Sequence, residues 1–308
     1  MSFASLAYRT STRGASVAAV ACAGVGAGTA QAQDGFDAYA EIEVRAVQSD
    51  RRVVDGDDVE SSGIGASLDA GFEWRSGRTE VQFDLGASIF DFSSETRPTR
   101  ESGSATASIA HEVVDDVTVE LGAGHWEDIT TLEARQTDQD AMQLRVTWED
   151  RKNRVRVGAQ YREREYETPN TLTKGDGMRY DFQYNRRFGA WHWARIDLRA
   201  EDIDSENTRR GYERYVARAS YSRPIAKRLR LRPEIEYRRW KYDGRRVVSD
   251  PARPLREDSY IAPEIGLAYG GLSGLRARAS AAYQFRSSND PRFGKDAPYI
   301  DVRVSYRF

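Results

Sequence analysis

The 308-residue chain has one cysteine and no long hydrophobic run in most of its length. Cys22 lies near the N-terminus, so the remainder has neither a disulfide framework nor a cysteine-based metal site. After residue 35, no apolar stretch approaches the roughly 20 residues that a membrane-spanning helix requires. These absences exclude a disulfide-stapled scaffold and a helical membrane protein.

Lysine and histidine are also scarce. The 46 basic residues comprise five lysines and 41 arginines, against 48 acidic residues and three histidines. The resulting net charge of −2 indicates neither nucleic acid nor an anionic lipid surface as a partner. The mean hydropathy of −0.70 is compatible with a transmembrane β-barrel, because only alternate residues of each strand would face lipid.

The N-terminal segment has the order of features found in secretion signals. Arg9 and Arg13 precede a small, mostly apolar stretch over 14–29, which Ala30-Gln31-Ala32 follows as a cleavage site. We therefore predict a signal peptide over 1–32 and a mature domain over 33–308. The alternatives are an alanine-rich N-terminus without this role and a lipoprotein signal centred on Cys22.

From residue 36 onward the sequence alternates with period two, which is typical of strands with two different faces. Over 64–74, 81–89, 275–285 and 300–308, apolar residues alternate with polar or small ones. Strands are predicted over 36–47, 63–74, 79–90, 103–114, 117–126, 140–149, 154–165, 178–188, 191–202, 212–222, 229–240, 258–269, 275–286 and 298–308. This pattern predicts an all-β, antiparallel, up-and-down transmembrane barrel of about 14 strands, with 12 or 16 as alternatives.

The connections between these strands alternate in length. Short turns are predicted at 75–78, 115–116, 150–153, 189–190, 223–228 and 270–274, and long polar loops at 48–62, 91–102, 127–139, 166–177, 241–257 and 287–297. Short turns are periplasmic in such barrels, so both ends of the domain are expected there. The loop over 241–257 is long enough to fold inward, although a solvated surface loop is the commoner arrangement.

All six tryptophans fall at or near predicted strand ends. We interpret them as interface aromatics, since Trp favours the two membrane interfaces; they are Trp74, Trp126, Trp148, Trp191, Trp193 and Trp240. A soluble β-sandwich also alternates, but it gives no reason for placing every Trp at a strand end.

With these features in place, the chain resembles a bacterial outer-membrane barrel of the monomeric porin type over nearly all of 33–308. The final strand, with Tyr306 and Phe308, resembles the signal that the barrel-assembly machinery recognises. The resemblance implies periplasmic chaperones, that machinery and outer-membrane lipid as partners. A weaker likeness, over 221–242 and 286–290, is to the barrels of surface-lipoprotein assembly modifiers, but the helical-repeat domain that usually precedes those barrels is not seen.

The predicted inward faces carry charges of opposite sign in different parts of the chain. An acidic wall is predicted from Glu41, Glu43, Asp69, Glu73, Glu80, Asp84 and Glu120. A basic wall is predicted from Arg145, Arg156, Arg162, Arg179, Arg195, Arg199, Arg218, Arg230, Arg232, Arg276, Arg278 and Arg303. The two walls would create a transverse field across a polar channel.

A second interpretation of the same residues is that they neutralise one another. Carboxylates such as Asp197, Glu234 and Glu264 lie among the arginines and can form cross-strand pairs that fill the lumen. Asp69 and Asp84, on consecutive strands, would repel strongly in a dry interior, which favours water there.

Three functions follow from this sequence. The first is a channel for passive or weakly selective diffusion of small hydrophilic solutes. The second is a non-enzymatic barrel that assists export or surface assembly of lipoprotein or polysaccharide. The third is a surface hydrolase, for which His125 is the candidate base, although His111, His125 and His192 lie in no recognisable catalytic pattern. No cofactor, metal or nucleic-acid partner is expected, and the chain is predicted not to be an enzyme.

Overall fold

The computed structural model describes residues 35–308 except 51–52, 56–57, 95–98, 133, 135, 169–170 and 271–273. The predicted signal peptide over 1–32 and its cleavage site lie outside the described residues. Among the residues that are described, no helix is long and apolar enough to cross a membrane.

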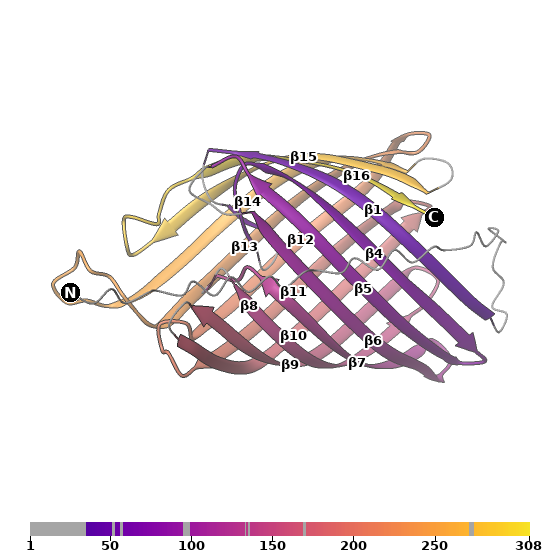
Figure 1. The fold of residues 1–308 in the computed structure, drawn as a ribbon. Coiled ribbons are helices and arrows are strands. Elements are labelled where there is room, and N and C mark those ends of the chain that lie inside the picture. Colours follow the sequence, from indigo (N-terminus) through magenta and orange to yellow (C-terminus); the bar gives the residue numbers. More distant parts are fainter. Residues whose placement is uncertain are drawn as a thin grey trace, which may run out of the picture.

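Fourteen antiparallel strands form a closed barrel, which confirms the predicted fold and strand number (Figure 1). The barrel strands are β1 (Gly35–Ser49), β4 (Gly63–Ser76), β5 (Thr79–Phe92), β6 (Arg100–Val114), β7 (Val117–Ile129), β8 (Thr137–Glu149), β9 (Asn153–Thr168), β10 (Thr171–Gly189), β11 (His192–Ser205), β12 (Tyr212–Ala226), β13 (Leu229–Arg246), β14 (Leu255–Gly270), β15 (Leu275–Ser288) and β16 (Ala297–Arg307). Two short strands, β2 (Val53–Asp55) and β3 (Asp58–Glu60), pair with each other between β1 and β4.

The first and last barrel strands close the sheet. β1 pairs along one edge with β4, where Glu41 lies opposite Asp69, and along the other with β16, where Glu41 lies opposite Arg307. Closure leaves no free sheet edge within the barrel, which removes the unpaired backbone groups that lipid cannot hydrogen-bond.

Alternate connections are tight, as predicted, and define a short-turn end of the barrel. Only residues 77–78 join β4 to β5, and only 115–116 join β6 to β7. Gly77 (φ 55°) and Asp116 (φ 69°) occupy the left-handed region in these turns, a conformation that glycine and, less readily, aspartate accept. The opposite end, with the longer connections, is called the long-loop end below.

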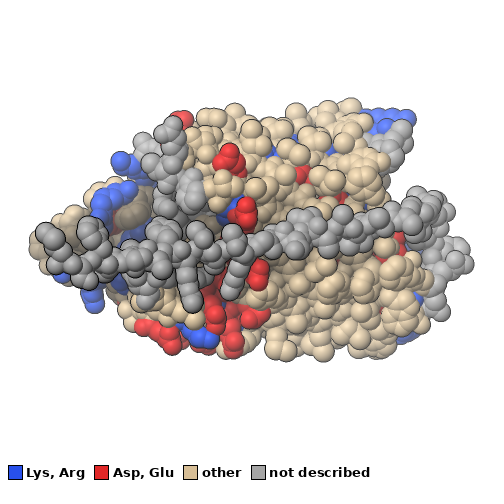
Figure 2. Space-filling model, in the orientation of Figure 1, with Lys and Arg blue, Asp and Glu red and all other residues tan. Residues whose placement is uncertain are grey.

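The outer wall is apolar along most of its height. Its side chains include Ile42, Leu68, Leu85, Leu144 and Ile265, which are 43 to 56% exposed. Figure 2 shows a broad surface without charges and a group of acidic side chains toward one end. An exposed apolar belt of this extent is the surface expected of a barrel embedded in lipid.

Several strands are longer than predicted, and the predicted loop over 166–177 is wrong. β9 continues to Thr168 and β10 begins at Thr171, so that segment is an extended hairpin. Similarly, β13 runs to Arg246, and β14 begins at Leu255. These extensions are mostly polar, with only a few scattered apolar residues such as Leu172 and Tyr242, so the regular alternation that marks a strand within lipid is absent there, although the backbone pairing continues.

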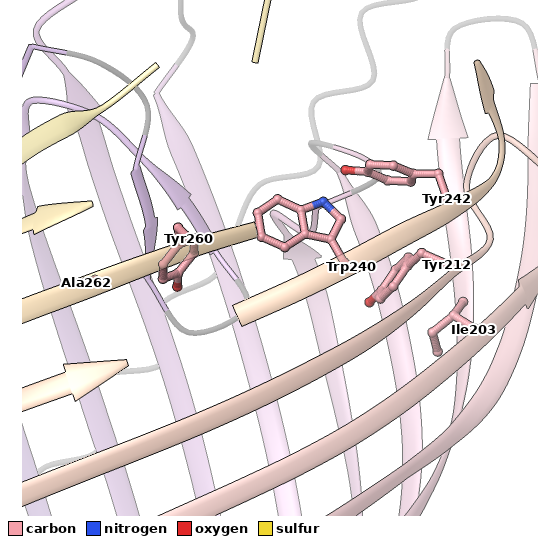
Figure 3. Close-up of a cluster of buried hydrophobic side chains, with 6 residues drawn as sticks. All are labelled: Ile203, Tyr212, Trp240, Tyr242, Tyr260 and Ala262. Carbon is pink, nitrogen blue, oxygen red and sulfur yellow. The ribbon is translucent and has the colours of Figure 1, made fainter. Parts of the chain in front are cut away.

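The barrel interior contains a compact group of buried side chains near the long-loop end. Ile203, Tyr212, Trp240, Tyr242, Tyr260 and Ala262 come from four neighbouring strands, β11 to β14 (Figure 3). Leu132, from the connection between β7 and β8, packs against this cluster. That connection therefore contacts the opposite side of the barrel, and part of the interior is filled with protein.

Candidate functional site in the barrel lumen

The strand register places every predicted acidic-wall residue on the inner face. Asp69 lies opposite Glu41, Ser67 opposite Glu43 and Glu73 opposite Asp37, while the alternate residues such as Leu68 face outward. On β5, Glu80 and Asp84 belong to the alternate residues that face inward, and on β7 the same holds for Glu120.

Asp69 is exposed although it faces the lumen. Gly86, across the ladder on β5, supplies the space: a Cβ atom at this position would lie 2.9 Å from Asp69 Oδ1 and 2.6 Å from Ser104 Oγ. The Asp69 carboxylate and the Ser104 hydroxyl therefore lie over Gly86, in space that a larger residue would occupy.

Asp84 is half-buried and hydrogen-bonded. It accepts hydrogen bonds from Tyr39 Oη and from Gln82 Nε2, the latter at 2.9 Å. Thr106 Oγ1 also donates to it, at 3.4 Å. Local hydroxyl and amide groups, rather than arginines of the opposite wall, therefore satisfy this carboxylate.

The predicted basic-wall arginines also share the inner face, but many are paired with carboxylates on their own side of the barrel. Arg195 contacts Asp197 at 2.7 Å, and Arg278 contacts Glu264 at 2.6 Å. Arg303 contacts Asp301 at 2.7 Å. These pairs match the neutralising interpretation of the sequence.

Other predicted arginines show the same behaviour. Asp181 bridges Arg179, at 2.7 Å, and Arg199, at 3.1 Å. Arg218 contacts both Glu234, at 3.2 Å, and Glu236. The lumen therefore combines a partly solvated acidic side with a basic side in which most charges are matched.

Two pairs join the predicted acidic and basic sets directly. Arg145 Nη1 lies 2.7 Å from Glu120 Oε1, and Arg276 Nη1 lies 3.7 Å from Glu41 Oε2.

Three predicted basic-wall arginines make close contacts with uncharged side chains. Arg156 Nε donates to Thr147 Oγ1 at 3.3 Å. Arg230 lies over the ring of Trp191 at 4.5 Å, and Arg232 over that of Trp193 at 5.3 Å.

A buried ionic network on β9, β11 and β12 was only partly anticipated. Glu201, whose side chain has no exposed surface, contacts Arg214, Arg162 at 2.9 Å and Arg164 at 3.6 Å, and it accepts a hydrogen bond from Tyr212 Oη at 2.8 Å. Arg162 was predicted to be inward, but Arg164 and Arg214 were not singled out. Every second residue of β9 and of β12 faces inward, and Arg164 and Arg214 continue those series. This alternation is the sequence signal that identifies them.

Polar cavities remain between the inner side chains, and two of them lie among the predicted basic-wall residues. One, of about 230 Å³, is lined by residues such as Gln143, Arg156 and Asp181 from β8 to β13. The other, of about 380 Å³, lies along β11 to β16 and β1 and is lined almost wholly by charged and hydroxyl-bearing side chains. The arrangement offers polar space for water and small solutes inside the barrel.

The tryptophan prediction needs correction. Trp74 and Trp148 are exposed on the outer wall near the short-turn end, as an interface position requires. Trp240 is instead 2% exposed and faces the interior, between Arg214 and Asp258 in the ladder.

Two further tryptophans differ from the prediction, because the strand register places Trp126 and Trp193 on the inner face. Trp191, in the short turn between β10 and β11 with φ 64°, is 65% exposed, and its interface position stays a prediction. A strand-end position does not reveal which face a side chain occupies, so the two-sided tryptophan girdle is wrong.

Both predicted assembly residues are exposed: Tyr306 lies in the final strand, and Phe308 directly follows it. Tyr306 and Phe308 are 40% and 67% exposed, and their rings contact each other edge to face at 4.8 Å. The Phe308 amide donates to the Ala40 carbonyl at 2.8 Å, which attaches the end of the chain to β1. Their recognition by an assembly machinery stays a prediction.

The histidines lie apart from one another. His125 is on the outer wall, with Nδ1 2.8 Å from Asp140 Oδ1 and Nε2 3.7 Å from Glu127 Oε1. His111 meets Thr79 Oγ1 at 3.0 Å, and His192 meets Tyr221 Oη at 2.6 Å. Within the described part of the chain, no hydroxyl is hydrogen-bonded to His125, and no group of three or more His, Cys, Asp or Glu residues is arranged to hold a metal ion.

Solved structures with a similar fold are bacterial outer-membrane barrels. The outer membrane channel DcaP of Acinetobacter baumannii has a TM-score of 0.54 at 8% identity, covering 92% of this chain and 100% of that one. The anion-selective porin from Comamonas acidovorans gives 0.52 at 9% identity, covering 90% and 100%. A loop-deletion mutant of OmpT, an outer membrane protein of Vibrio cholerae, gives 0.52 at 12% identity, covering 89% and 99%.

These similarities establish the class of fold: a bacterial outer-membrane β-barrel. No protein-family model and no curated protein sequence matches the chain.

Proposed function

We propose that this protein is an outer-membrane channel for small hydrophilic solutes, with lumenal carboxylates and arginines setting its selectivity. The observation that carries the proposal is the exposed carboxylate of Asp69, which faces the lumen from the interior of β4. A carboxylate in that position needs water around it, because a dry interior would penalise its charge by several kcal/mol, on the order of the usual burial cost.

The filling of the long-loop end suggests a narrow channel. The Glu201 network and the Trp240 cluster occupy the interior beside β9 to β14, and Leu132 approaches them from the other side. On the opposite side, the inner faces of β4 to β6 carry small residues such as Ser67, Gly86 and Ser104, whose short side chains fill less of the lumen. Solutes would therefore pass along the acidic, small-residue wall.

Conductance across a planar bilayer tests the proposal directly. Purified, refolded protein should produce steady unitary currents in potassium chloride. Protein heated until the barrel unfolds, added with the same detergent, serves as the control and should give none. Folded barrels that never conduct, despite confirmed insertion, would contradict a channel function.

A further inference from the structure

The cavity of about 380 Å³ contains more arginine than its carboxylates can match. Its lining includes six arginines: Arg45, Arg195, Arg218, Arg232, Arg278 and Arg303. Only four carboxylates line it: Asp197, Glu234, Glu264 and Asp301. The residues that line the cavity therefore carry two more positive than negative charges.

The four carboxylates are already engaged. Asp301 accepts from both Arg303, at 2.7 Å, and Arg45, at 2.5 Å. Asp197 is held by Arg195, and Glu264 by Arg278 and by Tyr299 Oη at 3.3 Å. Glu234 meets Arg218 at 3.2 Å.

Arg232 is the arginine without a carboxylate. Within the described residues its guanidinium makes no ion pair, and its central carbon lies over the ring of Trp193, 5.3 Å from the ring centroid. A guanidinium stacked on an aromatic face keeps its hydrogen-bonding edge available for a planar oxyanion.

Arg232 and Ser280 lie in one row of the ladder, which runs from Arg232 on β13 through Gly266 on β14 to Ser280 on β15. Gly266 has no side chain, so no side chain stands between the guanidinium and the hydroxyl in this row. Ser280 and Ser220 both line the cavity, and the two residues are 6% and 9% exposed. Among the described residues, neither hydroxyl has a hydrogen-bond partner.

We propose that this cavity binds a small dianionic solute through carboxylate or phosphate oxygens, with Arg232 as the principal ligand and Ser280 as a hydroxyl donor. Paired N–H groups of a guanidinium match two oxygens of either anion, and the ligand charge balances the two excess arginines. As the substrate class of the channel this inference rests on the proposed function, but binding itself can be measured without transport.

The test is calorimetric titration of folded barrels in detergent near neutral pH. Succinate supplies the dicarboxylate and inorganic phosphate the phosphate oxygens, with acetate as the monoanion. At least one dianion should bind at least about tenfold more tightly than acetate, and R232Q should weaken that binding at least about tenfold, the scale of a lost charge-assisted contact. Succinate binding alone or phosphate binding alone would identify the oxyanion.

Two further variants separate the site from general electrostatics. Arg276→Gln removes the same charge from a lumenal side chain that is 58% exposed and outside the cavity lining, and it should leave the dissociation constant nearly unchanged. Gly266→Leu retains every charge but places a bulky side chain between Arg232 and Ser280; a Cβ atom there meets its nearest neighbours at 3.4 to 3.6 Å, so the substitution begins without a clash. It should abolish binding while the barrel remains folded.

Equal weakening by R232Q and R276Q would overturn the inference, as would a failure of both dianions to bind the folded wild-type barrel. Binding without conductance would retain the anion site and remove the channel proposal. Conductance without binding would retain the channel proposal and remove the anion site.

Discussion

Glu201 shows how one carboxylate can organise the interior of the barrel. Its side chain is fully buried, and three guanidinium groups and the Tyr212 hydroxyl converge on it. Charges removed from water in this way require nearly complete pairing, because an uncompensated buried charge is much more costly than an exposed one.

Removing this carboxylate should strongly destabilise the barrel. Glu201→Ala leaves three arginines without their shared partner, so the free energy of unfolding should fall by about 3 kcal/mol or more. Urea unfolding of the refolded protein measures it. Glu120→Ala breaks the more exposed contact with Arg145 and should cost less, on the order of 1 kcal/mol. If both variants lowered the free energy of unfolding by the same amount, burial would not be the reason for the importance of Glu201.

At the scale of the element, the connection from β15 to β16 is organised by Asp290. Its carboxylate is inaccessible to solvent and accepts from Arg292 Nη2 at 2.6 Å and from the Arg292 amide at 3.1 Å. The hydrogen bonds with Arg292 lower the pKa of Asp290 from 3.8 to about 2. The ionised form is therefore the one that the folded loop favours.

This pKa predicts a stability change in acid. Because the folded value lies below the ordinary one, the contribution of Asp290 is complete above about pH 4 and is lost as the pH falls toward 2. Asp290→Asn should remove that part of the pH dependence in unfolding experiments, and Arg292→Gln should do the same. If both variants kept the wild-type slope between pH 4 and 2, the ion pair would not be its source.

At the scale of the whole molecule, the inner charges are distributed unequally around the barrel. The basic side neutralises much of its own charge through pairs such as Arg195 with Asp197, while Asp69 on the acidic side stays exposed. The field experienced by a passing ion therefore depends most on the few lumenal groups that lack a close opposite charge.

Charge reversal at Asp69 should consequently change ion selectivity. Asp69→Arg is expected to shift the reversal potential in a potassium chloride gradient toward anions. Glu163→Arg changes the charge equally but on the exposed outer face of β9, and it should leave selectivity unaltered. The same shift from both variants would show that the effect does not arise in the lumen.

The sequence by itself determined the barrel and the inward positions of the charged residues, and it favoured 14 strands over the alternatives of 12 or 16. Alternation with period two records which face meets lipid, and it fixes that face residue by residue wherever the outer wall is apolar. The pattern is not informative at the long-loop end, where 166–177 is mostly polar without regular alternation and yet includes the end of β9 and the beginning of β10.

Only the tertiary structure decided which charges meet. Glu201 joins arginines from β9 and β12, and Asp301 joins Arg45 across the closure of the barrel, 256 positions away in the chain. Those contacts depend on strand stagger and side-chain reach, neither of which a pattern of inward positions contains. The same is true of Trp240, whose place near a strand end suggested the membrane interface but whose side chain lies in the buried interior.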